Sequence, residues 1–467
     1  MRRTMLASSV LALAGGCMPG DFGAALDKAP VQVMGAPDGF GSSADLTLLP
    51  LPPPADPNRP NLAARLLFAG TDAASVALAD FDGDGKPQVQ AVSGDKFDTL
   101  LGLDPSQPGQ GISSAARLIG STAVGSAAAE IIVLGMPNLG SSLGQGTVAF
   151  LTLGVDASGN ADFESAGNLR YGLSTESQFG LVVASGRVTQ AAADEAIVVS
   201  DSGVHVLGFP TGDVVSNASC ALVTPGPQNI YRSLAVGNFL LDSDGGTRQE
   251  IAVGLANTGG TAPGRVVILQ YNAGAVGLSC PIELSVPGGN SPGFGTALAV
   301  VPHLNGDGMA DLVVGAPPDH AYLFHSPLNG TTLTNTFTRS DPSLQFGQRL
   351  ALVHIEADGT QQGIAITALQ ANLGSTKNAE QVLVYKLNGD GITPVAVVDD
   401  SALTVTGNTD FGLAELEFNS SLACAKGQVA RVLVAGADAG IFTFFRLAGP
   451  VAPTTVLAPD PRCFAQK

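Results

Sequence analysis

The stretch that decides the fold begins with the run Gly293-Phe294-Gly295-Thr296-Ala297-Leu298-Ala299-Val300-Val301. An acidic turn, Asn305-Gly306-Asp307-Gly308, separates it from a second apolar run, Asp311-Leu312-Val313-Val314-Gly315-Ala316-Pro317. A third run, Ala321-Tyr322-Leu323-Phe324, follows. Runs that are apolar on both faces belong to strands covered on both sides. The stretch therefore predicts three consecutive strands inside a packed all-β domain.

The same unit recurs along the chain on either side of this stretch. The second run has counterparts at Val89–Val92, Ile131–Leu134, Ile197–Val199, Ile251–Val253, Ile364–Ile366 and Val432–Val434. The third run has counterparts at Thr147–Leu151, Val204–Leu207, Val266–Leu269, Val382–Tyr385 and Ile441–Phe444, with a less clear one at Phe97–Leu101. The leading Phe-Gly pair returns at Phe179-Gly180, Phe346-Gly347 and Phe411-Gly412. The chain thus carries seven copies of one unit.

The Phe-Gly start, the Asp/Asn-Gly turn and the Gly-Ala-Pro end resemble FG-GAP repeats, the units of the integrin α-subunit propeller. The resemblance covers about residues 61–450, and its spacing of about 40 to 70 residues suits four-stranded blades. It implies a seven-bladed β-propeller of four-stranded antiparallel blades over residues 62–458. Because an open edge strand invites aggregation, we expect Arg65–Ala69 or Thr454–Leu457 to complete the last blade. Two packed β-sandwiches are the alternative fold.

The N-terminal segment predicts export. Arg2 and Arg3 precede an apolar stretch that is too short to span a bilayer. The sequence ending at Cys17 resembles a bacterial lipobox, so residues 1–16 are predicted to be a signal peptide and Cys17 to carry lipid. An ordinary cleaved signal is the alternative. Residues 17–61 end in a proline-rich run and are predicted to form an extended tether, and residues 459–467 a C-terminal tail. Met18 favours the outer membrane, by the same resemblance.

Charge limits the classes of partner. The chain has 22 Lys and Arg against 40 Asp and Glu, a net charge of −18. Bulk electrostatics therefore exclude nucleic acid and anionic lipid as partners, which leaves the N-terminal lipid as the only predicted membrane contact. The acidic excess is compatible with cation binding.

Two turns offer oxygen ligands for calcium. The first contains Asp80, Asp82 and Asp84 at alternate positions, a pattern that suits a hard cation and resembles the calcium loop of FG-GAP blades. The turn of the quoted stretch offers Asn305, Asp307 and Asp311, but His303 holds its first position. We expect structural calcium at the first turn and at this fifth one. The alternative at both is a turn that uses Asp, Asn and Gly for backbone geometry alone.

Cysteines favour an oxidising compartment. Besides Cys17, four cysteines can pair in three ways, and no C-x-x-C motif points to zinc or redox chemistry. Their places within the repeats favour the pairs Cys220–Cys280 and Cys424–Cys463.

Catalytic signals are weak. Two G-x-S-x-G strings, beginning at Gly140 and Gly289, are no more than a glycine-rich chain yields by chance. His205 and His325 fall in or beside predicted third strands, where packing or surface roles are expected, and His320 has no evident partner. We expect a binding or scaffolding module rather than an enzyme, one that recognises an envelope protein or a polysaccharide. The alternatives are a calcium-containing propeller enzyme that acts on polysaccharide and a structural part of an outer-membrane assembly.

Overall fold

The computed structural model describes residues 33–35, 46–51, 62–70, 76–82, 87–91, 111–119, 130–139, 144–155, 161–165, 170–171, 177–189, 193–209, 214–216, 229–241, 248–257, 261–274, 277–286, 289, 291–330, 333–338, 345–355, 361–368, 381–399, 412–418, 430–437 and 441–446. These residues form an all-β structure of seven antiparallel sheets, as the sequence predicts for the fold class. No helix within them is long and apolar enough to cross a membrane.

The sheets follow one another along the chain. The first contains β2 (Leu46–Leu51), β3 (Leu62–Gly70), β4 (Val76–Asp82) and β5 (Pro87–Ala91). The second contains β6 (Ser114–Leu118), β7 (Glu130–Met136) and β8 (Thr147–Val155), with β9 (Ala161–Ser165) and β10 (Arg170–Tyr171) both on β8. The third contains β11 (Val183–Gly186), β12 (Glu195–Ser200), β13 (Gly203–Leu207) and β14 (Val214–Ser216).

The later sheets repeat this order. The fourth contains β15 (Asn229–Gly237), β16 (Glu250–Asn257), β17 (Arg265–Asn272) and β18 (Gly277–Leu284). The fifth contains β19 (Ala297–Pro302), β20 (Ala310–Ala316), β21 (His320–Phe324) and β22 (Leu333–Thr338). The sixth contains β23 (Leu350–His354), β24 (Gln362–Ala368), β25 (Gln381–Asn388) and β26 (Gly391–Asp399), and the seventh β27 (Gly412–Phe418), β28 (Ala430–Ala437), β29 (Ile441–Arg446) and β1 (Val33–Gly35).

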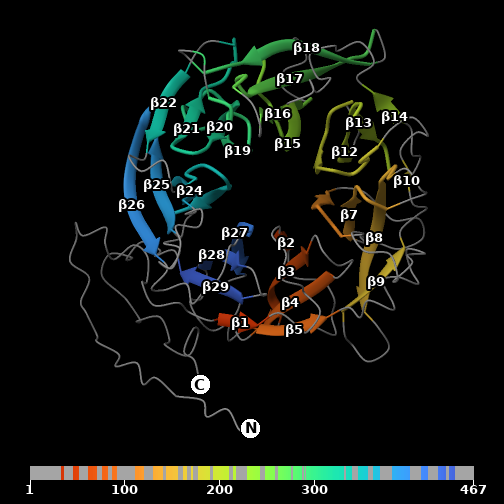
Figure 1. The fold of residues 1–467 in the computed structure, drawn as a ribbon. Coiled ribbons are helices and arrows are strands. Elements are labelled where there is room, and N and C mark those ends of the chain that lie inside the picture. The colour runs from red at the N-terminus through yellow and green to blue at the C-terminus, as the bar shows by residue number, and fades with distance from the viewer. Residues whose placement is uncertain are drawn as a thin grey trace, which may run out of the picture.

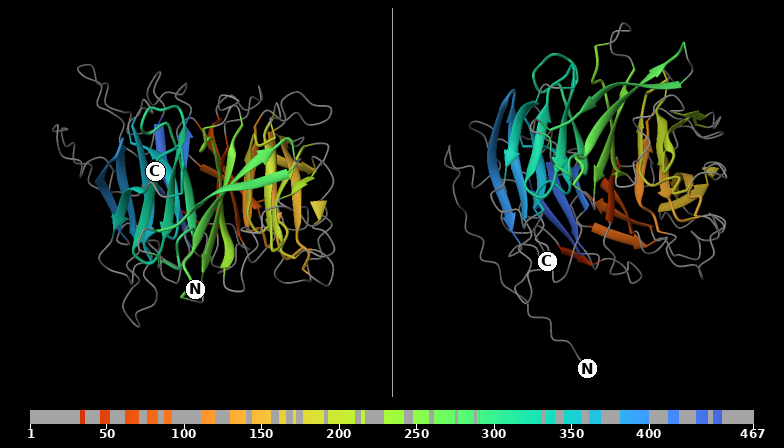
Figure 2. Two further views of the ribbon diagram at one scale, coloured as in Figure 1. Left: turned by 90° about the horizontal axis from the view of Figure 1, so that it is seen from above. Right: turned by 45° about the horizontal axis from the view of Figure 1, so that its top comes forward.

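The sheets surround a common axis (Figure 1) and stand side by side around it (Figure 2). The first strand of each sheet contacts the first strand of the next, in the circuit β2, β6, β11, β15, β19, β23, β27 and back to β2. The hydrophobic clusters lie between neighbouring sheets; one, for example, combines residues of the fourth and fifth sheets. Every residue of β12, β16 and β20 is buried. This explains why the second strands are apolar on both faces.

The Phe-Gly and Gly-Ala-Pro motifs meet at the contact between sheets. Phe294 is fully buried, while Gly295 has a φ of 89° and donates its N–H to Gly315 O at 3.0 Å. Gly315, in turn, lies against the next sheet: a Cβ built on it would come 2.1 Å from the carbonyl oxygen of Gly347. Gly254 of the fourth sheet lies in the same way against Gly295 O, also 2.1 Å from an added Cβ. The second-strand glycine is therefore required by close approach of the next sheet, not merely by the end of a strand.

Two sheets that lack the Phe-Gly pair make the same contact with other residues. Ile112, just before β6, and Tyr231, within β15, are buried where the third, fifth and sixth sheets have Phe. The hydroxyls of Ser113 and Ser233 donate to the carbonyl oxygens of the next sheets' glycines, at 3.0 and 2.8 Å. The contact between sheets is thus preserved although the motif is lost.

Hydrogen bonds also join consecutive sheets near the ends of the first strands. These junction hydrogen bonds pair Ile119 with Asp194, Arg187 with Gln249, Asn238 with Ala310, Pro302 with Gln362 and His354 with Glu415. The first two pairs are reciprocal, each residue donating its backbone N–H to the other. Pro302 has no N–H, so within this pair only the amide of Gln362 donates, to Pro302 O at 2.6 Å.

The N-terminal boundary of the domain differs from the prediction. The expected tether, residues 17–61, contains β1 and β2, so the sheet structure begins well before residue 62. β1 pairs with β29, Val33 opposite Thr443 and Gly35 opposite Ile441, and completes the seventh sheet. Arg65–Ala69 instead lies within β3 of the first sheet. Residues 1–16, Thr454–Leu457 and the predicted tail lie outside the described residues.

The alignment of the first copy is also corrected. The sequence predicts a second strand at Val89–Val92, but β5 holds residues 87–91 and is the last strand of its sheet. The turn after Asp82 therefore joins the third and fourth strands. The physical reason is that β2, from the expected tether, and β3 fill the two inner positions of the sheet. In the other six sheets, the apolar runs predicted to be second strands do lie in second strands. The second sheet differs from the expected four strands, because it has five.

Candidate functional site

The turn between β19 and β20 is built by its own side chains. His303, Gly306 and Gly308 have positive φ values of 52°, 78° and 83°, a conformation that glycine adopts without strain. The Asn305 carboxamide oxygen accepts from Asp307 N at 3.1 Å, and Asp307 Oδ1 accepts from Met309 N at 2.7 Å. Asn305 and Asp307 thus use their oxygens to hold the backbone of the turn, and both are exposed.

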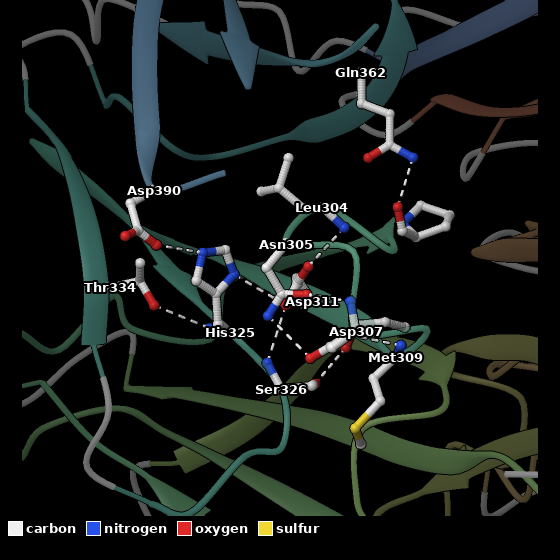
Figure 3. Close-up of polar contacts among 12 residues, drawn as sticks. Leu304, Asn305, Asp307, Met309, Asp311, His325, Ser326, Thr334, Gln362 and Asp390 are labelled. Carbon is white, nitrogen blue, oxygen red and sulfur yellow. Dashed lines mark hydrogen bonds and ion pairs between the residues drawn. The ribbon is translucent and has the colours of Figure 1, made fainter. Parts of the chain in front are cut away.

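Asp311, the next predicted ligand, points into the structure instead of toward the turn surface (Figure 3). Its residue exposure is 0%. Oδ2 accepts from Leu304 N at 3.0 Å, and Oδ1 accepts from Ser326 N at 3.0 Å. Hydrogen bonds to a charged group contribute about 1.5–3 kcal/mol each, which is what makes burial of a carboxylate tolerable.

A third donor reaches Asp311 from His325, which directly follows β21. His325 Nδ1 lies 3.0 Å from Asp311 Oδ1, and Nε2 lies 3.0 Å from Oδ1 of Asp390. Asp390 sits in the turn between β25 and β26, so the imidazole bridges the fifth and sixth sheets (Figure 3). Ionised carboxylates only accept hydrogen bonds, so both bonds form when both ring nitrogens carry hydrogen, as in imidazolium.

The same position carries a buried acid in the two preceding sheets. Glu195 Oε2 accepts from Val188 N at 3.0 Å and Thr189 N at 2.8 Å. Glu250 Oε2 accepts from the N–H groups of Phe239 and Leu240, at 2.7 and 3.1 Å. In three consecutive sheets, then, the acid at the start of the second strand closes the turn before it through backbone N–H groups.

This arrangement does not fit a calcium ion at the fifth turn. Each of the three predicted ligands accepts at least one N–H hydrogen bond from within the chain, and Asp311 Oδ1 also lies 3.0 Å from His325 Nδ1. Within the described part of the chain, no group of three or more His, Cys, Asp and Glu side chains is placed to hold a metal. The geometry matches the alternative interpretation, in which the turn uses Asp, Asn and Gly for its own structure.

The first turn is described only in part. Asp80 and Asp82 lie in β4, and Asp80 is buried with 3% exposure. Asp84 lies outside the described residues, as do Cys17, Cys220, Cys424 and Cys463. Cys280 lies in β18, half-buried beside the hydrophobic cluster of the third and fourth sheets.

The remaining histidines have structural partners. His205 Nε2 lies 3.1 Å from Ser200 Oγ, and both residues are buried, so His205 is packed as predicted. His320 Nδ1 lies 2.5 Å from Asp319 Oδ1, a pair that the sequence did not reveal. The His320 ring stacks on Tyr322, and burial, with a smaller contribution from Asp319, raises the pKa of the Tyr322 phenol.

The fold and the turns together define an all-β, propeller-like protein. Residues 294–323 match the FG-GAP repeat family. The matched segment contains the buried Phe294, the fifth turn, β19, β20 and all of β21 except its last residue. No curated protein matches the chain. Among solved structures it is similar to Sqt1 of Saccharomyces cerevisiae, with 15% sequence identity, 82% coverage of each chain and a TM-score of 0.44.

Proposed function

We propose that this protein is an exported, lipid-anchored seven-bladed β-propeller that works as a binding or scaffolding module of the cell envelope. The observation that carries the proposal is the unbroken circuit of contacts between the first strands of the seven sheets. A closed ring holds its loops on a rigid frame, and recognition residues are commonly placed on loops of this kind. Each sheet is, in this proposal, one blade.

Charge supports the choice of partner. With a net charge of −18, the ring favours a protein or polysaccharide over nucleic acid or an anionic membrane surface. The proposed anchor at Cys17 stands 16 residues before Val33 of β1, a length that spans at most about 58 Å when extended. The blades would then lie close to the outer membrane, within reach of envelope components.

A disulfide between blades is part of the proposal. Cys280 of β18 is held in a disulfide, and β18 contacts β14, the last strand of the preceding sheet. Cys220 follows β14 by four residues, which supports Cys220–Cys280 as the pair. Such a bond ties two blades at their outer strands, away from the circuit of first-strand contacts. Cys424–Cys463 remains the second proposed pair.

Calcium is proposed at the first turn alone. The variant Asp82→Ala/Asp84→Ala should melt at a lower temperature than the parent in millimolar calcium and at the same temperature in chelator. A calcium concentration about ten times Kd stabilises the bound form by about 1.4 kcal/mol. Equal melting of parent and variant in both buffers would remove the site. Asp307→Ala is the control, because the fifth turn is expected to show no calcium-dependent difference.

Affinity capture tests the proposed function. The full-length chain, coupled to beads, is exposed to envelope proteins and to a panel of purified polysaccharides. We expect one protein or one polysaccharide class to be retained and released by the free full-length chain added in excess. Shortened polysaccharide products would instead indicate the enzyme. A partner that co-purifies at fixed stoichiometry from the outer membrane would indicate the structural component.

A further inference from the structure

We infer that His325 takes the place of a cation in the fifth blade and latches this blade to the sixth. The latch consists of Asp311, His325 and Asp390, which belong respectively to the start of β20, the end of β21 and the turn between β25 and β26. It concerns how the ring is held together and stands whether or not the proposed ligand is found.

The geometry places one imidazole between two carboxylates. Exposure of the side chains rises along the latch, from 0% at Asp311 through 12% at His325 to 84% at Asp390. A doubly protonated imidazole donates to both carboxylates and offsets the charge of the buried one. Because Asp390 is in water, its ion pair contributes little by itself, and most of the energy resides in the contact between His325 and Asp311.

The surroundings hold the imidazole in this position. The backbone N–H of His325 donates to Thr334 Oγ1 at 3.1 Å, and the next residue, Ser326, donates its own N–H to Asp311. From the other side, the Asn335 amide donates to the backbone oxygen of Asp390. The turn of the sixth blade is thus fixed to the fifth blade at two points, through His325 and through Asn335.

The hydrogen bonds between the first strands differ from one junction to the next. The second and third blades share a reciprocal pair of N–H donors, as do the third and fourth. At the junction of the fifth and sixth blades Pro302 cannot donate, so the Gln362 amide donates the one hydrogen bond between Pro302 and Gln362. His325 and Asn335 add contacts between the same two blades, farther from the axis, on the outer strands.

A double-mutant cycle on the full-length chain tests the latch. His325→Ala should lower the melting temperature by about 3–6 °C, because it leaves a buried carboxylate with fewer donors. Asp390→Asn should lower it by about 1 °C or less. The double variant should melt at the same temperature as His325→Ala, because Asp390 loses its imidazole partner in both. These differences should be the same in calcium and in chelator.

The control is His320→Gln, which removes another imidazole–carboxylate contact at the opposite end of the fifth blade, where both side chains are about one-third exposed. Its melting temperature should match the parent's. If His325→Ala does not fold, His325→Gln gives the same cycle with a smaller amplitude. Additive effects of His325 and Asp390 would overturn the latch. So would a calcium-induced rise in melting temperature that Asp307→Ala abolishes, since a cation would then occupy the turn.

Discussion

Gly315→Ala is expected to destabilise the protein by about 3 kcal/mol, one of the two largest effects predicted for a single substitution. The added Cβ would come 2.1 Å from the carbonyl oxygen of Gly347 in the next sheet. Both groups belong to backbone that hydrogen bonds hold in place, so the clash is relieved only if two sheets move apart. Chemical or thermal unfolding measures the loss.

The matched control is Gly306→Ala in the same sheet. Unlike Gly315, Gly306 has a positive φ, of 78°, and nothing lies within 4 Å of an added Cβ. That variant should lose only the cost of backbone strain, about 1 kcal/mol. If the two alanine variants unfold alike, the close approach of the sheets is not what requires glycine at position 315.

Asp311→Ala is expected to cost about 3–5 kcal/mol, as removal of one member of a buried charged pair does. The substitution leaves Leu304 N, Ser326 N and the His325 imidazole without their common acceptor. Asp307→Ala, in the same turn but exposed, should lose only a small fraction of that stability. Equilibrium unfolding of both variants in chelator makes the comparison without any effect of metal.

The opposite ranking would be informative. Were Asp307→Ala as damaging as Asp311→Ala, and only in calcium, the two carboxylates would act together as ligands. We expect the buried carboxylate to dominate in either buffer, because its partners are N–H groups of the chain.

Local patterns predicted the regular part of the ring well. Second strands such as β16 and β20 are apolar on both faces because sheets pack on both sides of them, and that environment leaves a clear signature in sequence. The Phe-Gly pairs were also recognisable, since burial of Phe294 and the positive φ of Gly295 allow few other residues. Where Ile112 or Tyr231 replaces Phe, the signature was lost but the contact was not.

Long-range pairings were not predictable in the same way. β1 is three residues long and pairs with β29, Val33 lying opposite Thr443 some 410 residues later, so no local periodicity marks it. β2 contains Pro50, which favoured the interpretation of a tether. An Asp-Gly turn suits any hairpin, and so the turn after Asp82 could be assigned to the wrong pair of strands.

The contacts of the candidate site were likewise only partly predictable from the sequence. Sequence indicated that Asp311 matters, because an acid follows a Gly-rich turn and begins an apolar strand. It could not reveal that His325, 14 residues later, and Asp390, in the next sheet, converge on it. The role of a carboxylate depends on which donors surround it, and those donors come from separate hairpins.

A crystal structure of the full-length chain grown in calcium, with an anomalous difference map, tests the central claim most directly. The claim is that a closed ring of seven blades is held together by the chain's own carboxylates, imidazole and amides. We predict seven sheets completed by β1, His325 between Asp311 and Asp390, and no calcium at the fifth turn. A calcium ion bound by Asn305, Asp307 and Asp311, with His325 turned away, would contradict the claim.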